Sequence, residues 1–555
     1  MAFDDILTNY LGEFGRYQAL QYLLVQVPNM FTAMQSLSWT FTAAKMKHRC
    51  LYPGEHAGAA FSANDSWHEH VADLAGDKPG CTRIVNMSVN QYLPTGSKVS
   101  TESCLGGYAW DYSDMTLSAV NRWDLVCDRD VIRAVIQSMY YVGQFLGSIV
   151  FGILADTIGR RPVFLLAILT QVICGLGMAF SPWWPLLMVL RIGVGLAHPG
   201  IAIMSTVILA ELVGPRYRVM ATVGGGICFN LGEVVLGALA YPLRDYRYLQ
   251  LTISVPALVF ASYWWLVPES ARWLISRGRF EKADRILRRV AKFNGHDSLP
   301  PDWHQRIEKD KFTSELKVFE AIAALFRTPN LRKRTLITFF IWPVVTMCYY
   351  GLALNPSFMG GDDRMAFIVG GLLELPGLII LLLVLNWVGR KFMACAGLWL
   401  ASLCLLITLG IPSSVPVASM ILVVVGKSAL NAVFGTIYIM TPEHYPTIIR
   451  NTATGACSMI ARAGGVAASF MSLYLAANHP SAVALTFASL SFVAGALVLL
   501  LPETTGEPLL ETLDDAEAFG AGQPIFMSGY KCRNLAIDRM RRNEENEMRN
   551  VGSQK

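Results

Sequence analysis

The sequence predicts an all-α membrane protein whose twelve transmembrane helices form two six-helix bundles. Three observations support this prediction: the composition is apolar, segments of membrane-spanning length recur, and motifs of the first half return in the second. Of 555 residues, 53% are hydrophobic and 16% are charged, which is more apolar than a soluble globular chain normally is. We therefore expect the lipid bilayer to surround most of the chain.

Twelve apolar segments are long enough to cross a bilayer. A helix needs roughly 20 residues to span the ~30 Å hydrocarbon core. Such segments lie at 18–42, 131–155, 163–181, 184–210, 219–241 and 249–267, and then at 335–356, 365–388, 392–411, 417–440, 452–476 and 481–501. We expect an N-terminal six-helix bundle over 18–267 and a C-terminal six-helix bundle over 335–501.

Positive charge gathers in the polar stretch 268–334 that separates the two bundles. Its first part carries eight basic residues: Arg272, Arg277, Arg279, Lys282, Arg285, Arg288, Arg289 and Lys292. The positive-inside rule places this stretch, the Arg160–Arg161 loop and the Arg216–Arg218 loop in the cytosol. The terminal segments, 1–17 and 502–555, then also lie in the cytosol, in a multi-pass protein of the plasma membrane.

The same basic stretch predicts an amphipathic helix. Over 270–295 apolar residues recur at helical spacing with arginines on the other face, so we expect this helix to lie along the inner membrane surface.

The net charge of +5 is small for this length and follows the topology. We find no nucleic-acid-binding signal, and residues 1–18 lack the pattern of a cleaved signal peptide.

The connection between the first two segments, 45–130, is long and contains four of the eleven cysteines. These are Cys50, Cys81, Cys104 and Cys127. The topology places this loop outside the cell, where the environment is oxidising. We expect two disulfides in one of three possible connectivities. Two sequons, at Asn64 and Asn86, predict N-glycosylation of the same loop.

Motifs of the first half recur in the second at offsets of 230 to 234 residues. The three pairs are Gly159-Arg160-Arg161 with Gly389-Arg390-Lys391, Glu211 and Arg218 with Glu443 and Arg450, and Pro268-Glu269-Ser270 with Pro502-Glu503-Thr504. Offsets this similar indicate an internal duplication of a six-helix unit. Duplicated units of this kind are found in transporters whose two bundles rock about a central site.

The stretch from Gly152 to Pro162, GILADTIGRRP, resembles the signature loop of the major facilitator superfamily. Gly159 permits a tight turn between two helices, and the acidic and basic side chains of the loop can form ion pairs that break when the bundles rock. We therefore predict a gating role for seven residues of this loop and its repeats: Asp156, Arg160, Arg161, Glu211, Arg218, Glu443 and Arg450.

Further motifs resemble those of the solute carrier 22 family, whose members transport organic cations, zwitterions and anions. They are the N-terminal MAFDDIL and GEFGRYQ, the cysteine-bearing loop, PESARWL at 268–274, PEHYPTIIRN at 442–451 and PETTG at 502–506. The resemblance covers the chain up to its C-terminal tail and implies the twelve-helix major facilitator fold. It implies a carrier, not an enzyme, and we find no metal-ligand cluster or phosphate-binding loop.

Ionisable residues inside membrane spans are costly and therefore point to function. Arg462 lies deep in the eleventh segment, where the resemblance places arginine in carriers of anions and zwitterions. The lysine that anion carriers of the family add in the eighth segment is replaced here by Leu378. Glu374 and Glu233 are acidic and Lys427 is basic, so the four charged side chains predict a cavity of balanced charge.

Aromatic residues are expected to form the walls of the same cavity, since their π faces attract ammonium groups and stack on aromatic ions. The resemblance places five of them at cavity positions: Tyr241, Tyr349, Tyr350, Phe434 and Tyr438. It also places Ser36 of the first segment there. These residues complete the predicted substrate-binding set.

Our preferred interpretation is a polyspecific carrier of organic cations or zwitterions that works by alternating access. Amines, quaternary ammonium ions and carnitine-like zwitterions are the ligands implied, with Glu374 facing an ammonium group and Arg462 a carboxylate. An organic anion carrier or exchanger that uses Arg462 is the closest alternative, and a non-transporting receptor or scaffold on this fold is another. No cofactor is expected, and coupling to Na⁺ or H⁺ need leave no signature in the sequence.

Overall fold

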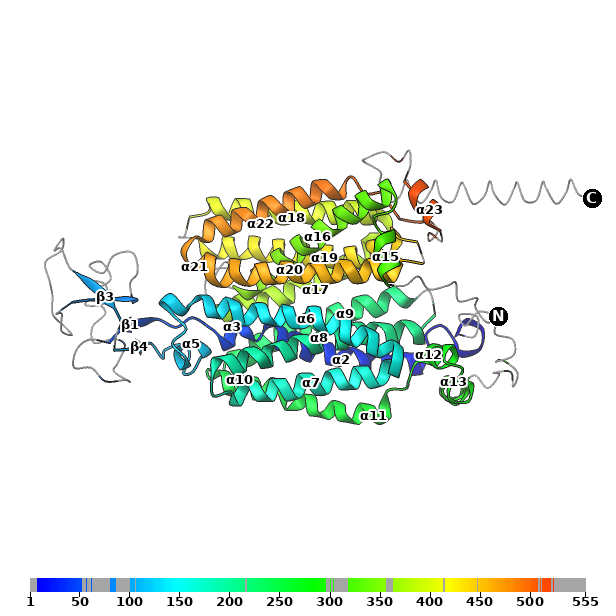
Figure 1. Cartoon of the computed structure of the whole chain (residues 1–555), viewed down its shortest axis with the longest axis horizontal. Helices are drawn as coiled ribbons and strands as arrows, with labels where there is room; N and C mark the ends of the chain where they lie inside the picture. The colour runs from blue at the N-terminus through cyan, green and yellow to red at the C-terminus, as the bar shows by residue number, and fades with distance from the viewer. Residues whose placement is uncertain are drawn as a thin grey trace, which may run out of the picture.

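Helices account for most of the fold and form two stacked groups of membrane-length segments (Figure 1). The computed structural model describes residues 7–523 apart from these gaps: 52–55, 57–60, 62–79, 86–99, 105, 215–216, 296–299, 301–302, 304–317, 356–362, 413–414, 447, 508–509, 511 and 521–522. Each of the twelve predicted segments contains a helix.

The first group follows the order of the chain. Its helices are α2 (Arg16–Leu37) with α3 (Trp39–Thr42), α6 (Val131–Ile158), α7 (Arg160–Phe180), α8 (Trp184–Leu212), α9 (Arg218–Ala240) and α10 (Tyr246–Ser254), which continues through η4 (Pro256–Ser262) into α11 (Tyr263–Leu266). The last segment changes to 3-10 geometry at Pro256, because proline lacks the backbone N–H that an α-helix would use there.

The second group repeats this arrangement. Its helices are α16 (Pro329–Leu354), α17 (Asp363–Val388), α18 (Arg390–Gly410), α19 (Pro416–Glu443), α20 (Arg450–Phe470), which continues through η6 (Met471–Leu475) into α21 (Ala476–Asn478), and α22 (Pro480–Val498). Shorter helices are η1 (Leu7–Leu11), α5 (Ala119–Arg122), η2 (Cys127–Arg129), α12 (Ala271–Ser276), α13 (Phe280–Asn294), α15 (Val318–Ala324) and α23 (Leu513–Ala518).

Two short antiparallel sheets stand at one end of the helices. Strands β1 (His48–Cys50) and β4 (Tyr108–Trp110) form one, and β2 (Thr82–Ile84) and β3 (Thr101–Ser103) form the other. We call this end the strand side, and the opposite end, which carries α12 and α13, the basic side (Figure 1). The four cysteines of the loop pair as Cys50–Cys104 and Cys81–Cys127. The sequons at Asn64 and Asn86 lie outside the described residues.

Among the described residues, eleven helical segments are long and apolar enough to cross a membrane. The segment missing from this set is α2, which buries the polar side chains Gln18, Gln21, Gln26, Asn29, Thr32 and Gln35. Several of them bond to neighbouring helices: Asn29 to Ser205 of α8 at 2.9 Å, and Thr32 to Gln171 of α7 at 3.1 Å. Because the protein supplies these partners, α2 crosses the bundle despite its polarity.

A buried arginine anchors the first group. Arg191 of α8 is fully buried and donates to the carbonyls of Gln35 and Ser36, at 2.8 and 3.1 Å, and to the side chain of Gln137 at 2.7 Å. Its guanidinium also lies over the ring of Trp39. A planar group with five donors suits this set of acceptors, so Arg191 joins α2, α6 and α8, as expected for a structural residue.

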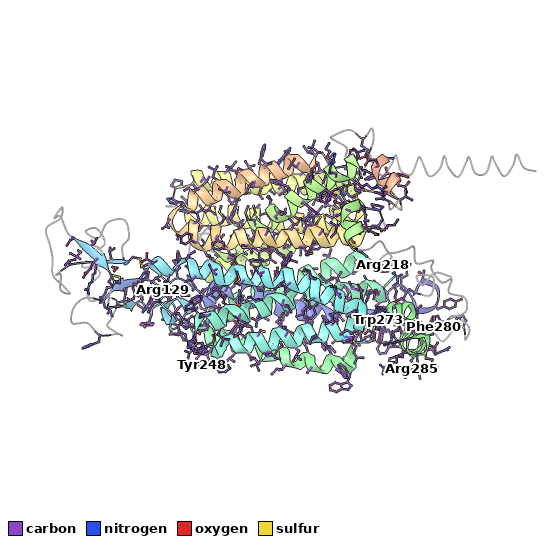
Figure 2. The ribbon with its side chains drawn as sticks, viewed as in Figure 1. Arg129, Arg218, Tyr248, Trp273, Phe280 and Arg285 are labelled. Atoms are coloured by element: carbon purple, nitrogen blue, oxygen red, sulfur yellow. A yellow bond between two sulfur atoms is a disulfide. The ribbon has the colours of Figure 1, made fainter. Side chains whose placement is uncertain are left out.

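The basic helix α13 does not place its apolar face in lipid. Its buried side chains, which include Leu287 and Val290, form one cluster with Leu7, Leu11 and Trp303. The sequence-based prediction placed this helix along the membrane surface, but η1 and α12 cover its apolar face. Packing within the protein therefore fixes the position of α13. On its opposite face, Arg285 points away from the bundle (Figure 2).

The two groups meet mainly through α6 against α20 and α9 against α17. Towards the strand side the contact is tight: a Cβ added to Gly465 of α20 would lie 2.3 Å from the ring of Tyr141 on α6. Arg364 at the start of α17 also donates to the carbonyl of Asp114 at 2.7 Å. Towards the basic side, a Cβ at Gly152 of α6 or Gly455 of α20 would meet nothing within 4 Å. The groups therefore close on the strand side and diverge on the basic side along α6 and α20.

This contact gives a matched pair of glycine variants. Gly465→Val should force the buried Tyr141 ring aside and cost about 1–3 kcal/mol in the strand-side-closed conformation, as overpacking does. Gly455→Val adds the same atoms where there is space. We expect a lower melting temperature in detergent for Gly465→Val and almost no change for Gly455→Val. Equal melting temperatures for the two variants would contradict the described closure.

Candidate functional site

Aromatic side chains from both helix groups form a continuous wall between them. The ring centroids of Tyr141 on α6 and Tyr350 on α16 lie 5.4 Å apart. Tyr349 follows at 5.2 Å from Tyr350, and Phe434 on α19 lies 6.3 Å from Tyr349 and 5.3 Å from Tyr438. Four of the five predicted aromatic residues thus come together, joined by Tyr141 from the other half.

Three of the predicted charged residues form a buried triad. The ammonium of Lys427 on α19 lies 2.5 Å from a carboxylate oxygen of Glu233 on α9 and 2.8 Å from one of Glu374 on α17. All three side chains are fully buried. Glu374 also accepts hydrogen bonds from Tyr349 at 3.1 Å and Asn431 at 2.7 Å. Lys427 is therefore the partner of both acids.

The fourth predicted charge, Arg462, lies apart from the triad. Its guanidinium donates to the hydroxyl of Ser458 one turn earlier at 3.2 Å, and its buried Nε has no hydrogen-bond partner. Tyr350, Tyr140 and His198 are among its neighbours. Among the described residues no carboxylate forms an ion pair with Arg462, which leaves this cation available.

Two predicted cavity residues lie elsewhere in the structure. Tyr241 stands just after the end of α9 on the strand side and is 55% exposed, outside the aromatic wall. Ser36 is buried in α2, and its carbonyl accepts a hydrogen bond from Arg191. Ser36 therefore lies beside Arg191 and next to Tyr140, a neighbour of the aromatic wall, and its cavity role stays a prediction.

The structure also adds residues that the sequence reasoning missed. His198 of α8 and Tyr140 of α6 share a hydrogen bond of 2.7 Å beside the aromatic wall. A histidine within an apolar span was the available signal. Asn431 could have been found from helical spacing, because Lys427, Asn431 and Phe434 are four and three residues apart and share one face of α19.

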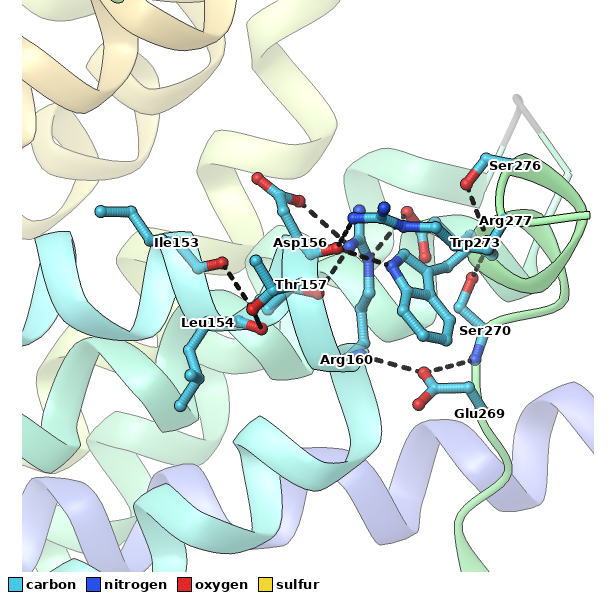
Figure 3. A network of polar contacts seen from close by, with 12 residues as sticks. Ile153, Leu154, Asp156, Thr157, Arg160, Glu269, Ser270, Trp273, Ser276 and Arg277 are labelled. Atoms are coloured by element: carbon cyan, nitrogen blue, oxygen red, sulfur yellow. Dashed lines mark hydrogen bonds and ion pairs between the residues drawn. The ribbon is translucent and has the colours of Figure 1, made fainter.

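The predicted gating residues of the first half form a network at the basic side (Figure 3). Arg160, at the start of α7, pairs with Asp156 at 3.1 Å and with Glu211 of α8 at 3.6 Å. The carboxylate of Glu269 accepts the backbone N–H groups of Arg160 and Arg161 at 3.0 and 3.2 Å. An acidic group is favourable here because the helix N-terminus presents free donors and a positive dipole end.

The second half repeats the arginine–glutamate pair and the carboxylate cap of this network. Arg390 pairs with Glu443 at 3.3 Å, and the carboxylate of Glu503 accepts the backbone N–H groups of Arg390 and Lys391 at 3.0 and 3.1 Å. The arginines at the start of α9 and of α20 also make equivalent contacts. Arg218 donates to the carbonyl of Ala210 at 3.3 Å, and Arg450 donates to that of Pro442 at 2.9 Å.

These contacts join helices of the same half. In the first half they connect α6, α7, α8 and the segment after α11, and in the second half the segment after α22 takes the same place. We predicted a latch that breaks when the bundles rock. In this conformation, in which α6 and α20 diverge on the basic side, the described contacts of Arg160 and Arg390 join helices of the same half, and the gating role of these residues stays a prediction.

Glu269 lies outside the membrane-spanning segments and is half-buried. Burial raises the pKa of its carboxyl above the ordinary value, while the backbone N–H groups of Ser270, Arg161 and Arg160 act in the opposite direction. These donors therefore stabilise the charged form of the carboxylate, and the carboxylate is the hydrogen-bond acceptor that the donors need.

Removing this carboxylate should weaken the first half. Glu269→Ala leaves three backbone donors without an acceptor, at a cost of about 1–3 kcal/mol in the free energy of unfolding. Glu503→Ala should have the same effect in the second half. The control is Glu281→Ala, the same substitution at an exposed position of α13. We expect lower melting temperatures for the first two variants only, and stability equal to that of the control would refute the capping role.

One group of potential metal ligands is found among the described residues. His48, Cys81 and Cys127 lie close together, but the two cysteines are joined as a disulfide. This group lies in the loop of the strand side. The site between the helix groups is a different one and consists of charged, aromatic and amide side chains.

Two six-helix halves with repeated loops and a charged, aromatic site between them define a membrane transporter of the major facilitator type. The family described as "Sugar (and other) transporter" matches residues 85–514. The xylose transporter XylE from E. coli, in its inward open conformation, has the same fold: the TM-score is 0.61 at 14% identity, over 91% of this chain and 100% of that one. Both findings confirm the predicted fold, and the family match confirms that the chain is a transporter, as predicted, and not an enzyme.

Similar proteins of known family identify the family within this superfamily to which the chain belongs. The "Organic cation transporter protein" of Drosophila melanogaster is 35% identical over 94% of this chain and 95% of its own length. "Solute carrier family 22 member 6" of Rattus norvegicus is 32% identical over 94% and 96%, and "Organic anion transporter 3" of Oryctolagus cuniculus is 33% identical over 93% and 94%. The chain belongs to the solute carrier 22 family and is a multi-pass membrane transporter of organic ions.

Proposed function

We propose that this protein carries zwitterionic and cationic organic ions across the plasma membrane by alternating access. One observation supports the proposal above the others: the aromatic wall runs from Tyr349, which donates to Glu374, to Tyr141, which packs on Gly465 one helical turn after Arg462. Charges of both signs therefore border the same aromatic wall. A ligand with an ammonium group and a carboxylate would match both.

The charge of the triad supports binding of an ammonium group nearby. Two carboxylates around one ammonium leave room for one further positive charge, a ligand ammonium or a proton, beside the rings of Tyr349 and Phe434. Aromatic faces attract ammonium groups, by about 2 kcal/mol or more where water is excluded. Quaternary ammonium ions without a carboxylate would use this part of the site alone.

Arg462 supports binding of a carboxylate. Its buried Nε lacks a partner, and a buried donor without an acceptor costs about 1–3 kcal/mol. A ligand carboxylate would remove that cost and form a charge-assisted hydrogen bond. In this proposal Arg462 selects zwitterions, and the triad with the aromatic wall accepts their ammonium end.

An organic anion carrier is the second candidate, and one observation favours it. Lys427 already pairs with both Glu233 and Glu374, which leaves Arg462 as the charge without an ion-pair partner. Relatives named for organic anions exist beside those named for organic cations. Against this candidate, the eighth segment has Leu378 where a second cation would be needed.

We also propose that the basic side faces the cytosol and the strand side faces outward. The eight basic residues between positions 272 and 292 support this orientation through the positive-inside rule. The two disulfides at the opposite end suit an oxidising compartment. The relation to an inward open transporter and the divergence of α6 and α20 then correspond to a conformation open to the cytosol.

Uptake by expressing cells tests the charge assignment. We expect wild type to accumulate labelled carnitine and tetraethylammonium. Arg462→Ala should reduce carnitine uptake at least tenfold, a loss of about 1.4 kcal/mol or more, and leave tetraethylammonium uptake largely unchanged. Glu374→Gln should reduce the uptake of both, because it removes the carboxylate that lies against the aromatic wall at Tyr349.

Two controls accompany this experiment. Arg462→Lys keeps the charge and should retain part of the carnitine uptake, and surface labelling confirms equal amounts of each variant in the membrane. Uptake of p-aminohippurate with no uptake of carnitine or tetraethylammonium would establish the anion carrier instead. Binding to the purified protein without flux into liposomes would point to a receptor.

A further inference from the structure

The buried triad is an ionic link between the two halves of the molecule. Glu233 belongs to α9 in the first half, while Lys427 and Glu374 belong to α19 and α17 in the second. Their side chains are fully buried, with Lys427 at 2.5 Å from Glu233 and 2.8 Å from Glu374. Any motion that separates α9 from α17 must therefore break the Glu233–Lys427 pair.

The charges of the triad do not balance. Two carboxylates face one ammonium, which leaves one negative charge where no water reaches, and such a charge is strongly unfavourable without compensation. Glu374 accepts neutral donors from Tyr349 and Asn431. Glu233 is worse placed, because its second oxygen is buried without a hydrogen-bond partner.

Among the described residues, the surrounding helices offer no second cation within ion-pair distance. From α16, Tyr349 donates its hydroxyl to Glu374 and lies under the ammonium of Lys427, and Tyr350 packs against the Tyr349 ring. On the other sides of α9, Asn29 of α2 and His198 of α8 lie near Gly225 and Phe229, respectively. Arg462 interacts with Tyr350 and makes no ion pair with either acid among the described residues.

A proton fits this site better than Na⁺ does. The ammonium of Lys427 already occupies the space between the two carboxylates, where a bound metal ion would lie. A proton needs no additional space, since it attaches to a carboxylate oxygen. Two acids that share one site bind one such proton readily, because the two like charges repel each other.

The affinity of the triad for this proton must depend on conformation. With the strand side closed, both acids lie together in a dry site. When the strand side opens, Glu233 leaves with α9 and enters water, and Lys427 and Glu374 remain as a neutral pair. The closed conformation therefore holds a proton more tightly than the open one. By linkage, lowering the pH stabilises the closed conformation.

We propose that the Glu233–Lys427–Glu374 triad is the proton-binding site of this transporter, taking up one proton when the strand side closes and releasing it when the strand side opens. The inference rests on the proposed alternating access, but not on the identity or charge of the substrate. It makes the proton the coupling ion of the conformational cycle.

Distance measurements between spin labels test the proposal in the full chain without any substrate. Labels at Tyr248→Cys on α10 and Val417→Cys on α19 report opening of the strand side, because both positions are exposed there and belong to different halves; Tyr248 is labelled in Figure 2. The chain without introduced cysteines supplies the background. In wild type we expect the short-distance population to grow as the pH falls from about 9 to 5, by up to about tenfold per pH unit for one proton.

Two variants separate a proton site from a merely structural cluster. Glu374→Gln leaves a neutral Lys427–Glu233 pair, so the closed population should stay large and lose its pH dependence. Glu233→Gln breaks the link between the halves, so the closed population should be smaller and equally independent of pH. Glu281→Gln, on the exposed face of α13, should behave as wild type.

Infrared spectroscopy gives a second readout, since the carbonyl stretch of protonated carboxyls should be stronger in wild type than in Glu374→Gln at the same pH, by the contribution of one carboxyl. Distances that do not change with pH in wild type would overturn the proposal, as would a pH response retained in both triad variants. Closure that depends on Na⁺ and not on pH would also overturn it. A failed uptake experiment with carnitine and tetraethylammonium would leave these outcomes unaffected, which separates this proposal from the proposed substrates.

Discussion

The polar groups that this chain places inside the bilayer gain hydrogen bonds only from the protein or a ligand, because hydrocarbon offers none. Three parts of the structure follow from this constraint. The polar helix α2 is paired by side chains of α7, α8 and α10, Arg191 is surrounded by carbonyls and an amide, and Lys427 is held between two acids. The deepest part of the fold is therefore organised by polar contacts as much as by apolar packing.

The same constraint separates what is rigid from what can move. The repeated loop networks around Arg160 and Arg390 satisfy the helix ends within each half, using the same carboxylate contact at Glu269 and Glu503. Between the halves, the described contacts are of two kinds. Aromatic and glycine residues pack along α6 and α20, and the charged triad joins α9 to α17 and α19. Two rigid units joined by a few bistable contacts are what a rocking motion requires.

The sequence predicted the membrane spans, the internal repeat and the cysteine-rich loop, because each depends on local composition or spacing. It also predicted most of the aromatic wall and all three residues of the triad as buried functional groups. It did not predict that Lys427 pairs with both acids, since that depends on the rotation of three helices about their axes. Tyr241 was misplaced for a related reason: a residue one position beyond a helix end can turn outward to the surface.

Whether a buried charge serves structure or ligand is decided by its partners. Arg191 and Arg462 are both deep arginines, and sequence alone hardly distinguishes them. Arg191 meets three strong acceptors from two helices, so little of its hydrogen-bonding capacity remains for a ligand. Arg462 has one hydroxyl as its described hydrogen-bond acceptor, and the Nε of both arginines lacks a partner among the described residues. Arg191 has therefore already gained from the protein most of the free energy that a carboxylate would supply, and this difference supports the proposal that Arg462 is the ligand-binding cation.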